Sequence, residues 1–150
     1  MIVLKNFIDL DNNEKEMIIR WRNHPKIRKW MKNSKEIKEK EHTVFMKLLQ
    51  KSKNRTYFLL KKDNDNLGVV SLRDNYLGIY ANPDKKRVGD VLLAKLIEYA
   101  FKIKKLPTLK AEVYKDNTKA IKLYTRFGFK KAKDSGDLIV MELKNENSKL

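Results

Sequence analysis

Residues 117–129 read N-T-K-A-I-K-L-Y-T-R-F-G-F, and this stretch decides the fold. Tyr124 follows Asn117 by seven residues, which is two helical turns, so both side chains project to the same side of a helix. Gly128 supplies the left-handed residue that commonly ends a helix, and an apolar, strand-like run follows it. The alternating residues before Asn117 predict a strand, so this part of the chain predicts a strand, a helix and a second strand in succession.

The remaining elements follow from the same signals. Apolar residues alternate in the predicted strands and recur every three or four positions in the predicted helices, and turn formers or Pro107 separate the blocks. The order of elements predicts a mixed α/β (α+β) domain with an antiparallel meander and crossover connections. The expected strands are 2–7, 56–61, 67–72, 76–80, 108–114, 129–133 and 138–143, and the expected helices lie within 12–22, 25–31, 41–49, 88–103 and 118–126.

Composition narrows the class of protein. A chain of 150 residues forms one core, so we expect a single domain over residues 1–144 and a flexible tail over 145–150. The absence of cysteine excludes disulfides, thiolate metal sites and a cysteine nucleophile. No apolar run approaches the roughly 20 residues that span a bilayer, and the first ten residues lack a signal-peptide pattern, so we expect a cytoplasmic protein.

Basic residues are in large excess, with 35 Lys+Arg against 19 Asp+Glu and a net charge of +16. This charge predicts attraction to a polyanion, which includes nucleic acid, an anionic lipid surface and phosphorylated small molecules. An AT-rich genome is an alternative source of the lysine excess. The net charge alone therefore does not identify the binding partner, which has to be inferred from sequence motifs.

The turn before the long helix, residues 82–88, is a candidate anion site. It follows a strand, carries several basic side chains, and leads into a helix whose first amides are free to bind phosphate. Gly89 would let the backbone approach a diphosphate closely, although it could equally ease the packing of one helix on another. A single glycine is a weaker signal than a glycine-rich phosphate loop.

The pattern N-x-x-A-x-x-x-Y-x-x-x-G-F in residues 117–129, preceded by the basic turn and the Gly89 helix, resembles the GNAT superfamily of N-acetyltransferases. The resemblance covers residues 2–143 and implies acetyl-CoA as cosubstrate, with its pyrophosphate at the basic turn and its pantetheine arm along the strand 76–80. It also implies that Tyr124 protonates the leaving thiolate. One departure is that the Q/R-x-x-G-x-G/A pattern appears as K-R-V-G-D-V. The implied cofactor-binding residues are Ile79, Tyr80, Lys86, Arg87, Val88, Gly89, Asp90, Val91, Asn117, Ala120 and Tyr124.

A narrower resemblance rests on R-W-R-N-H-P at 20–25, W-M at 30–31, E-H at 41–42, Y-F-L at 57–59 and Y-L-G-I-Y-A-N-P at 76–83. Together these segments are similar to the N-acetyltransferases of pseudaminic acid biosynthesis, which acetylate the 4-amino group of a UDP-linked 4-amino-4,6-dideoxy-N-acetyl-altrosamine. The departure is a short turn at 73–75, where relatives carry a longer hairpin. An arginine can bind a diphosphate and an aromatic ring can cover uracil. The implied acceptor-binding residues are Arg22, Trp30, His42, Ser71 and Tyr80.

Acetyl transfer to an amine requires a base, an oxyanion donor and a proton for the thiolate. The backbone at residues 79–80 is the expected oxyanion donor, and the Tyr124 phenol is the expected acid. Glu112, on the strand before Asn117, is the expected base, acting directly or through water; its alternative is an ion pair with a lysine. His42 is a rival base, and His24 is expected to cap a turn.

Other classes of function stay open at this point. A GNAT enzyme could modify a protein N-terminus, such as that of a ribosomal protein, and a noncatalytic nucleic-acid-binding module would suit the charge. A binding module has no need of Tyr124 in this pattern, which favours the enzyme. Two histidines without cysteines predict no metal site. We expect a monomer or homodimer that binds neither nucleic acid nor membrane.

Overall fold

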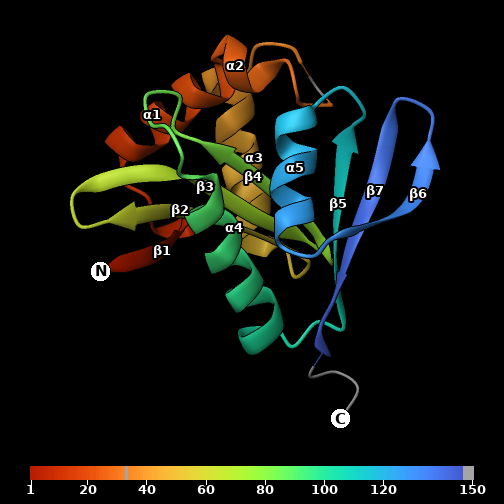
Figure 1. Cartoon of the computed structure of the whole chain (residues 1–150). Coiled ribbons are helices and arrows are strands. Elements are labelled where there is room, and N and C mark those ends of the chain that lie inside the picture. Colours follow the sequence, from red (N-terminus) through yellow and green to blue (C-terminus); the bar gives the residue numbers. More distant parts are fainter. Residues whose placement is uncertain (33, 147–150) are drawn as a thin grey trace.

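The computed structural model describes residues 1–32 and 34–146, and in this part of the chain seven strands form one sheet in the order β1-β2-β3-β4-β5-β7-β6 (Figure 1). Neighbouring strands are antiparallel except β4 and β5, which are parallel. The mixed α/β prediction is confirmed, with every expected strand present. The strands are β1 Ile2–Asn6, β2 Arg55–Lys62, β3 Asp65–Arg73, β4 Tyr76–Ala81, β5 Thr108–Tyr114, β6 Lys130–Ser135 and β7 Leu138–Lys144.

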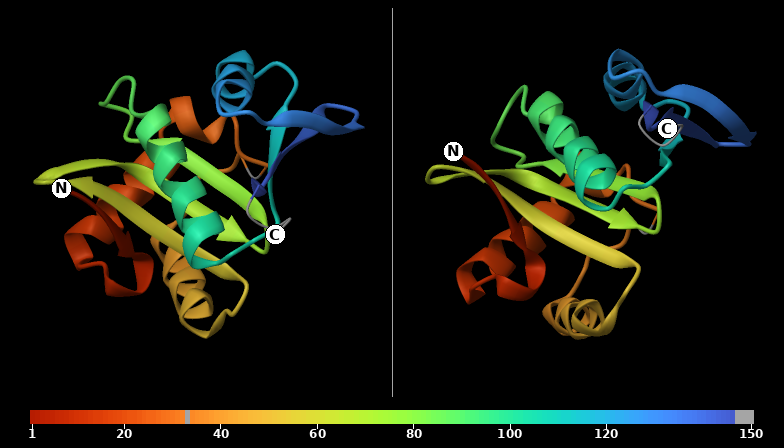
Figure 2. Two further views of the ribbon diagram at one scale, coloured as in Figure 1. Left: turned by 60° about the horizontal axis from the view of Figure 1, so that its bottom comes forward. Right: turned by 90° about the horizontal axis from the view of Figure 1, so that it is seen from below.

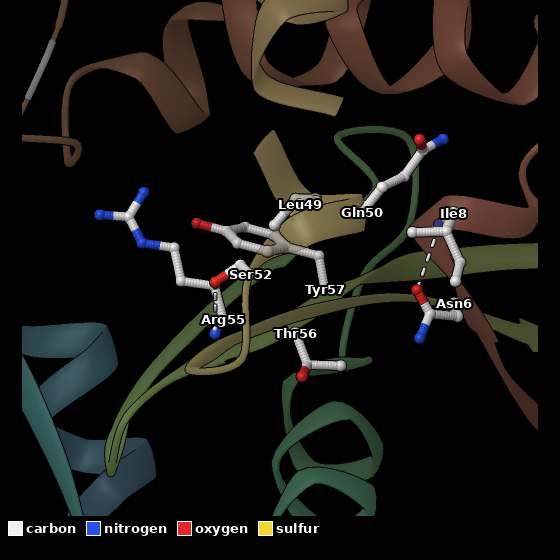
Figure 3. Close-up of a pocket in the computed structure, with 8 residues that line it drawn as sticks. All are labelled: Asn6, Ile8, Leu49, Gln50, Ser52, Arg55, Thr56 and Tyr57. Atoms are coloured by element: carbon white, nitrogen blue, oxygen red, sulfur yellow. Dashed lines mark hydrogen bonds between the residues drawn. The ribbon is translucent and has the colours of Figure 1, made fainter. Parts of the chain in front are cut away.

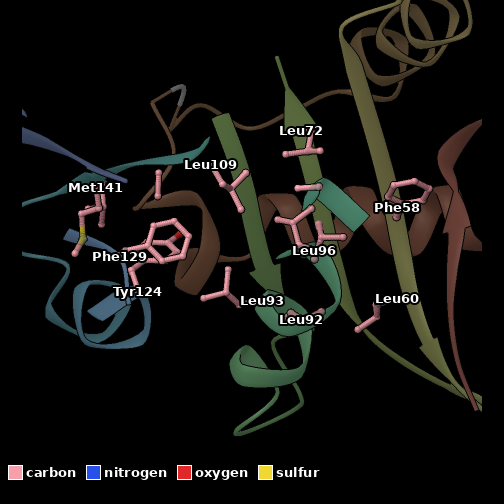
Figure 4. Packing of buried hydrophobic residues seen from close by; sticks show 14 of the residues in the cluster. Phe58, Leu60, Leu72, Leu92, Leu93, Leu96, Leu109, Tyr124, Phe129 and Met141 are labelled. Carbon is pink, nitrogen blue, oxygen red and sulfur yellow. The ribbon is translucent and has the colours of Figure 1, made fainter. Parts of the chain in front are cut away.

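Helices cover both faces of the sheet (Figure 2). Three helices and a short 3-10 turn, Phe7–Asp9, pack on one face, which is called the α1–α3 face below. Two helices pack on the opposite, α4–α5 face, where the larger apolar cluster lies (Figure 4). The helices are α1 Asn12–Asn23, α2 Pro25–Arg28, α3 Glu39–Lys51, α4 Gly89–Glu98 with a π-helical continuation over Tyr99–Ile103, and α5 Thr118–Arg126.

Alternation along the strands assigns each side chain to one of these faces. Leu109, Ala111 and Val113 of β5 join the α4–α5 cluster, so Glu112 between them faces the opposite side. By the same rule, Tyr80 of β4 packs against the α1–α3 cluster. The α1–α3 face of β4 and β5 therefore carries Tyr80 and Glu112, two of the side chains that the sequence proposes for the site.

The sheet opens between β4 and β5. These two strands are in register at Tyr76 and Lys110, near the start of each strand, and no further register pair joins them in the described residues. At this closed end the Lys110 amide donates a hydrogen bond to the Asn75 carbonyl oxygen at 2.8 Å. Because the strands separate beyond it, their later backbone groups are available to an extended ligand laid between them.

Glu14 fixes α1 to the sheet. Asp11 and Glu14 form a capping box, because the Glu14 amide donates to Asp11 Oδ1 at 2.8 Å and the Asp11 amide donates to Glu14 Oε1 at 3.0 Å. Lys5 and Lys61 also donate to the Glu14 carboxylate at 2.7 and 2.6 Å. Burial acts to raise the pKa of Glu14, but these hydrogen bonds outweigh it and lower the pKa to about 2.

Three features of the fold differ from expectation: the end of α2, the type of the last turn of the long helix, and the place of Asn145. Helix α2 ends at Arg28, so Trp30 and Met31 belong to the turn that follows it rather than to a helix. The long helix continues as expected to residue 103, but its last turn is π-helical. Asn145 is not part of a flexible tail, because it is buried and its side-chain amide donates to the Leu106 carbonyl oxygen at 3.0 Å. The end of that expected tail, 147–150, lies outside the described residues.

None of the helices in the described chain is long and apolar enough to cross a membrane.

Candidate active site

The turn before α4 has the geometry of an anion site. Arg87 has a positive φ of 61°, and the next residue, Val88, is right-handed with φ −96° and ψ −7°. Consecutive residues of opposite hand turn their amides toward one side, which forms a concavity that binds anions. Val88 also makes no side-chain cap, so the first amides of α4 are not taken by a capping side chain. The exposed Lys86 and Arg87 add positive charge to a site suited to a diphosphate.

Gly89 also has the packing role that was its alternative. A Cβ at this position would lie 3.3 Å from Leu123 Cδ2 of α5, so the glycine lets the two helices approach closely. Arg126 of α5 strengthens the contact by donating to Asp90 Oδ1 of α4 at 2.6 Å. This ion pair also neutralises the one carboxylate in the first turn of α4, which would otherwise repel a bound anion. A Gly89 variant would disturb packing and anion binding together, so a lysine is the better probe.

We expect Lys86→Ala to raise the dissociation constant for acetyl-CoA by about 10-fold, which is the loss of about 1.4 kcal/mol from one exposed charged contact. Titration calorimetry at two salt concentrations measures this, and the affinity of the variant should fall less steeply with salt. Lys51→Ala, an exposed lysine on α3, is the control and should bind as the unaltered protein does. Equal affinities for both variants would contradict a diphosphate site at this turn.

Tyr124 presents a neutral phenol inside the α4–α5 cluster (Figure 4). Its side chain is 5% exposed and its ring packs on Phe129 with 5.4 Å between centroids. Burial raises the pKa of Tyr124 above its ordinary value of about 10. Its hydroxyl donates to no other described residue, so the proton is available to a ligand. Helix α5 ends as expected, with Gly128 at φ 92°.

Asn117 has a structural task. It is the N-cap of α5, and its Oδ1 accepts a hydrogen bond from the Ala120 amide at 3.2 Å. Ala120 itself is partly buried against the same cluster as Tyr124. Both residues therefore help to place α5, and their expected contact with the cofactor stays a prediction.

A group of phenols surrounds Arg22 on the α1–α3 face. Burial lowers the pKa of the Arg22 guanidinium, while the nearby hydroxyls of Tyr80 and Tyr57 act in the opposite direction. Burial likewise raises the pKa of Tyr80. A guanidinium beside two phenols is an arrangement that can bind a phosphate through charge and hydrogen bonds. We call Arg22, Tyr57 and Tyr80 the phenol–arginine cluster.

Ser71 lies next to this cluster. It pairs with Gly78 across β3 and β4, and a Cβ at Gly78 would lie 2.4 Å from Ser71 Oγ. The glycine therefore leaves the room that the serine hydroxyl occupies. Ser71 and Tyr80 share a face of the sheet, and their contact with the acceptor stays a prediction.

His42 and Trp30 are less clearly placed for an acceptor. His42 is buried on α3, with its ring 6.1 Å from the Phe45 centroid. Burial and the positive charge of Lys15 lower its pKa, so it is neutral at pH 7. The Lys29 ammonium lies 5.2 Å from the centroid of the Trp30 ring, so this face of the ring is covered and does not stack on a planar base. His24 caps α2 as expected, with Nδ1 accepting from the Lys26 amide at 3.1 Å.

Glu112 takes part in the kind of ion pair that was the alternative to its role as a base. Lys32 Nζ lies 2.6 Å from Glu112 Oε1, and the two side chains are 58% and 27% exposed. The lysine belongs to the segment after α2, not to a neighbouring strand. Glu112 is therefore a partly covered carboxylate on the α1–α3 face, and its role as a base stays a prediction.

Sequence reasoning did not assign a role to four residues of this face, which are Tyr57, Arg73, Tyr76 and Lys110. Tyr57 joins the phenol–arginine cluster, and Tyr76 lies between the cations of Arg73, at 5.9 Å, and Lys110, at 5.7 Å. Strand register brings Arg73, Tyr76 and Lys110 together, and a contact of this kind depends on how whole strands pair.

Two surface pockets lie away from these residues. One, of about 150 Å³, lies between the end of α3 and the start of β2 (Figure 3). Tyr57 is the one member of the phenol–arginine cluster that lines it. A second, of about 440 Å³, includes Asn75 and Pro107 at the closed end of β4 and β5. Neither of these two pockets contains Tyr124 or Glu112. The described residues contain no group of three or more His, Cys, Asp or Glu side chains that could hold a metal ion.

Comparison with known proteins gives consistent matches over the whole chain. The model of the acetyltransferase (GNAT) family matches residues 16–129. Acetyltransferase PseH of Campylobacter jejuni subsp. jejuni serotype O:2 is 41% identical over 154 residues, which cover 99% of this chain and 98% of that protein. Acetyltransferase PseH of serotype O:23/36 is 40% identical with the same coverage.

Solved structures agree with the fold. Campylobacter jejuni N-acetyltransferase PseH in complex with acetyl coenzyme A superposes with a TM-score of 0.84 and 34% identity, covering 97% of this chain and 100% of that one. Spermidine N-acetyltransferase from Vibrio cholerae, in complex with CoA and spermine, gives a TM-score of 0.82 at 17% identity, covering 96% and 95%. At that identity the second likeness concerns the fold alone.

Proposed function

This chain belongs to the GNAT family of acetyltransferases, and we propose that it transfers an acetyl group from acetyl-CoA to the 4-amino group of a UDP-linked aminodideoxy sugar in pseudaminic acid biosynthesis. The observation that carries acetyl transfer is the buried Tyr124 phenol, whose hydroxyl has no hydrogen-bond partner among the described residues. The relative PseH, which was solved with acetyl coenzyme A, supports the same cosubstrate for this chain. The amide concavity at residues 87–89 suits its pyrophosphate, and the separated strands β4 and β5 suit its pantetheine arm.

Three groups of the chain carry the reaction in this proposal. Glu112, directly or through one water, accepts a proton from the acceptor ammonium, because only a neutral amine attacks a carbonyl. The backbone amide near the end of β4, at residues 79–80, stabilises the oxyanion that forms. Tyr124 gives its proton to the leaving thiolate as the carbon–sulfur bond breaks. Acetyl-CoA supplies the activated acetyl group, and transfer is direct.

The phenol–arginine cluster supports an acceptor that carries phosphate. Arg22 lies on the same face as Glu112, and two phenols beside it offer further hydrogen bonds. A UDP-linked sugar presents a diphosphate to the arginine and its amine to the carboxylate. A protein N-terminus is the alternative acceptor in this family and has no diphosphate to bind. A mass-spectrometric screen of UDP-linked amino sugars and N-terminal peptides with acetyl-CoA separates the two by the gain of one acetyl group.

We expect Arg22→Ala to raise the KM for the amino sugar by about 10- to 100-fold, the cost of one charged hydrogen bond, while kcat changes little. The contact is made equally before and during the reaction, so it affects binding rather than turnover. UDP alone should compete with the acceptor. Steady-state kinetics with both substrates varied measures these effects, and the KM for acetyl-CoA should stay constant.

Arg20→Ala is the matched control, since Arg20 is exposed on the same helix. It should leave the acceptor KM unchanged. If UDP fails to inhibit and Arg22→Ala behaves like Arg20→Ala, the nucleotide-sugar acceptor is wrong and only acetyl transfer remains.

A further inference from the structure

The Lys32–Glu112 ion pair places a primary amine at the proposed base. Lys32 Nζ is 2.6 Å from Glu112 Oε1, a hydrogen-bonding distance. An acceptor of a GNAT enzyme also presents an amine to the base at the start of the reaction. In the structure, the Lys32 amine of the chain itself occupies the position beside Glu112.

Contacts before and after Lys32 hold its segment over β5. Met31, just before it, packs against the α1–α3 cluster, and its amide donates to the Arg28 carbonyl oxygen at 3.2 Å. Near the other end, Asn23 of α1 clamps Ile37, donating to its carbonyl oxygen at 2.8 Å and accepting from its amide at 2.6 Å.

The position of Glu112 sets what Lys32 can reach. Glu112 is two residues beyond Lys110, and Gly78 is two residues beyond Tyr76, the partner of Lys110. Glu112 therefore faces the part of β4 that leads into residues 79–80, where the proposed function places the thioester carbonyl. Lys32 Nζ thus lies beside the same gap between β4 and β5.

We propose that Lys32 is an internal acceptor: with acetyl-CoA bound and no amino sugar present, the protein acetylates Nζ of its own Lys32. This inference rests on the proposed function, since it uses the same acid and base. Glu112 takes one proton from the Lys32 ammonium, and the neutral nitrogen forms a bond to the acetyl carbon. The carbon–sulfur bond breaks, Tyr124 protonates the thiolate, and the second nitrogen proton passes to solvent, which returns a proton to Tyr124. The products are an acetamide on Lys32 and CoA.

Acetylation of Lys32 removes its positive charge and with it the ion pair to Glu112. The carboxylate is then free of its internal partner. Because the amino sugar and Lys32 use the same carboxylate, the sugar should suppress the modification. The modification is therefore a reaction of the enzyme without its acceptor.

The test is a time course with deuterated acetyl-CoA on the purified full chain, followed by peptide mass spectrometry. Deuterium separates new acetyl groups from those acquired in the expression host. Lys29 and Lys38, exposed lysines of the same segment, are the internal references. We expect Lys32 to be labelled at least about 10-fold faster than either, a conservative share of the 10²- to 10⁴-fold that positioned acid–base groups contribute.

A parallel series with deuterated acetyl phosphate, which acetylates lysines without the CoA site, gives the chemical reactivity of each lysine. With acetyl phosphate, Lys32 should be labelled no faster than the reference lysines. With acetyl-CoA, Tyr124→Phe and Glu112→Gln should each reduce the preferential labelling of Lys32. An equal preference with both reagents, or none with either, overturns the proposal.

The same samples are tested with a UDP-linked amino sugar and acetyl-CoA, which separates the two proposals. Acetylated sugar without Lys32 preference overturns the internal acceptor alone. Lys32 preference without acetylated sugar overturns the sugar assignment and supports the internal acceptor.

Discussion

Replacing Tyr124 by phenylalanine should lower kcat by about 10- to 1000-fold, overlapping the range for loss of one general acid. The substitution removes only the hydroxyl, which makes no hydrogen bond to any other described residue, so the packing on Phe129 is kept. Folding and the affinity for acetyl-CoA should therefore change little. Steady-state kinetics, thermal unfolding and calorimetry of the same preparation measure all three.

The pH profile adds a second readout. Burial raises the pKa of Tyr124 above its ordinary value of about 10, so the phenol stays protonated over the working range of pH. The rate ratio between the unaltered protein and Tyr124→Phe should consequently be constant between about pH 6 and pH 9. Tyr99→Phe, in the same cluster against Phe58, is the matched control and should retain full turnover. Full turnover of Tyr124→Phe as well would mean that water or another group protonates the thiolate.

The local parts of the fold follow from the sequence because local signals act there. Thr118–Arg126 and Thr108–Tyr114 were predicted with their observed bounds, since a cap residue, a periodic apolar face and Gly128 define them. The capping box of Asp11 and Glu14 is equally local. The strands follow from alternation, which needs only neighbouring residues.

Contacts between distant segments were not predictable in the same way. The position of β7 between β5 and β6, and the opening between β4 and β5, depend on how whole elements pack. Asn145 reads as part of a polar tail, yet it is buried because the carbonyl of Leu106 accepts its amide. Tertiary hydrogen bonds of this kind leave no periodic trace in the sequence.

The candidate site likewise contains residues that local motifs identify and residues that only contacts between distant segments bring together. Tyr124 and the basic turn were identified because a compact motif contains them. Arg22, Ser71 and Tyr80 stay predicted acceptor residues, and Tyr57 was added to them only because the structure places it near Arg22. Gly89 and Glu112 each make the structural contact that was the alternative to a functional role, and their functional roles stay predictions.

Glu112→Gln is expected to lower kcat/KM for the amino sugar by about 10- to 100-fold near neutral pH, which is at or below the low end of the roughly 10²- to 10⁴-fold that one general base contributes. The amide keeps the size of the side chain but cannot accept the proton of the acceptor ammonium. As pH rises, a growing fraction of the acceptor amine is already neutral and needs no base. The loss should therefore shrink with rising pH, in contrast to the constant ratio expected for Tyr124→Phe.

Glu112→Gln also breaks the ion pair with Lys32, so a second variant must separate that effect from loss of the base. Lys32→Ala breaks the same ion pair and keeps the carboxylate. If Glu112 is the base, only Glu112→Gln shows a loss of kcat/KM that becomes smaller as pH rises. Lys32→Ala then shows at most a smaller loss that does not depend on pH. If both variants lose activity equally at every pH, the carboxylate serves to hold the segment after α2, and His42 or a bound water has to be the base.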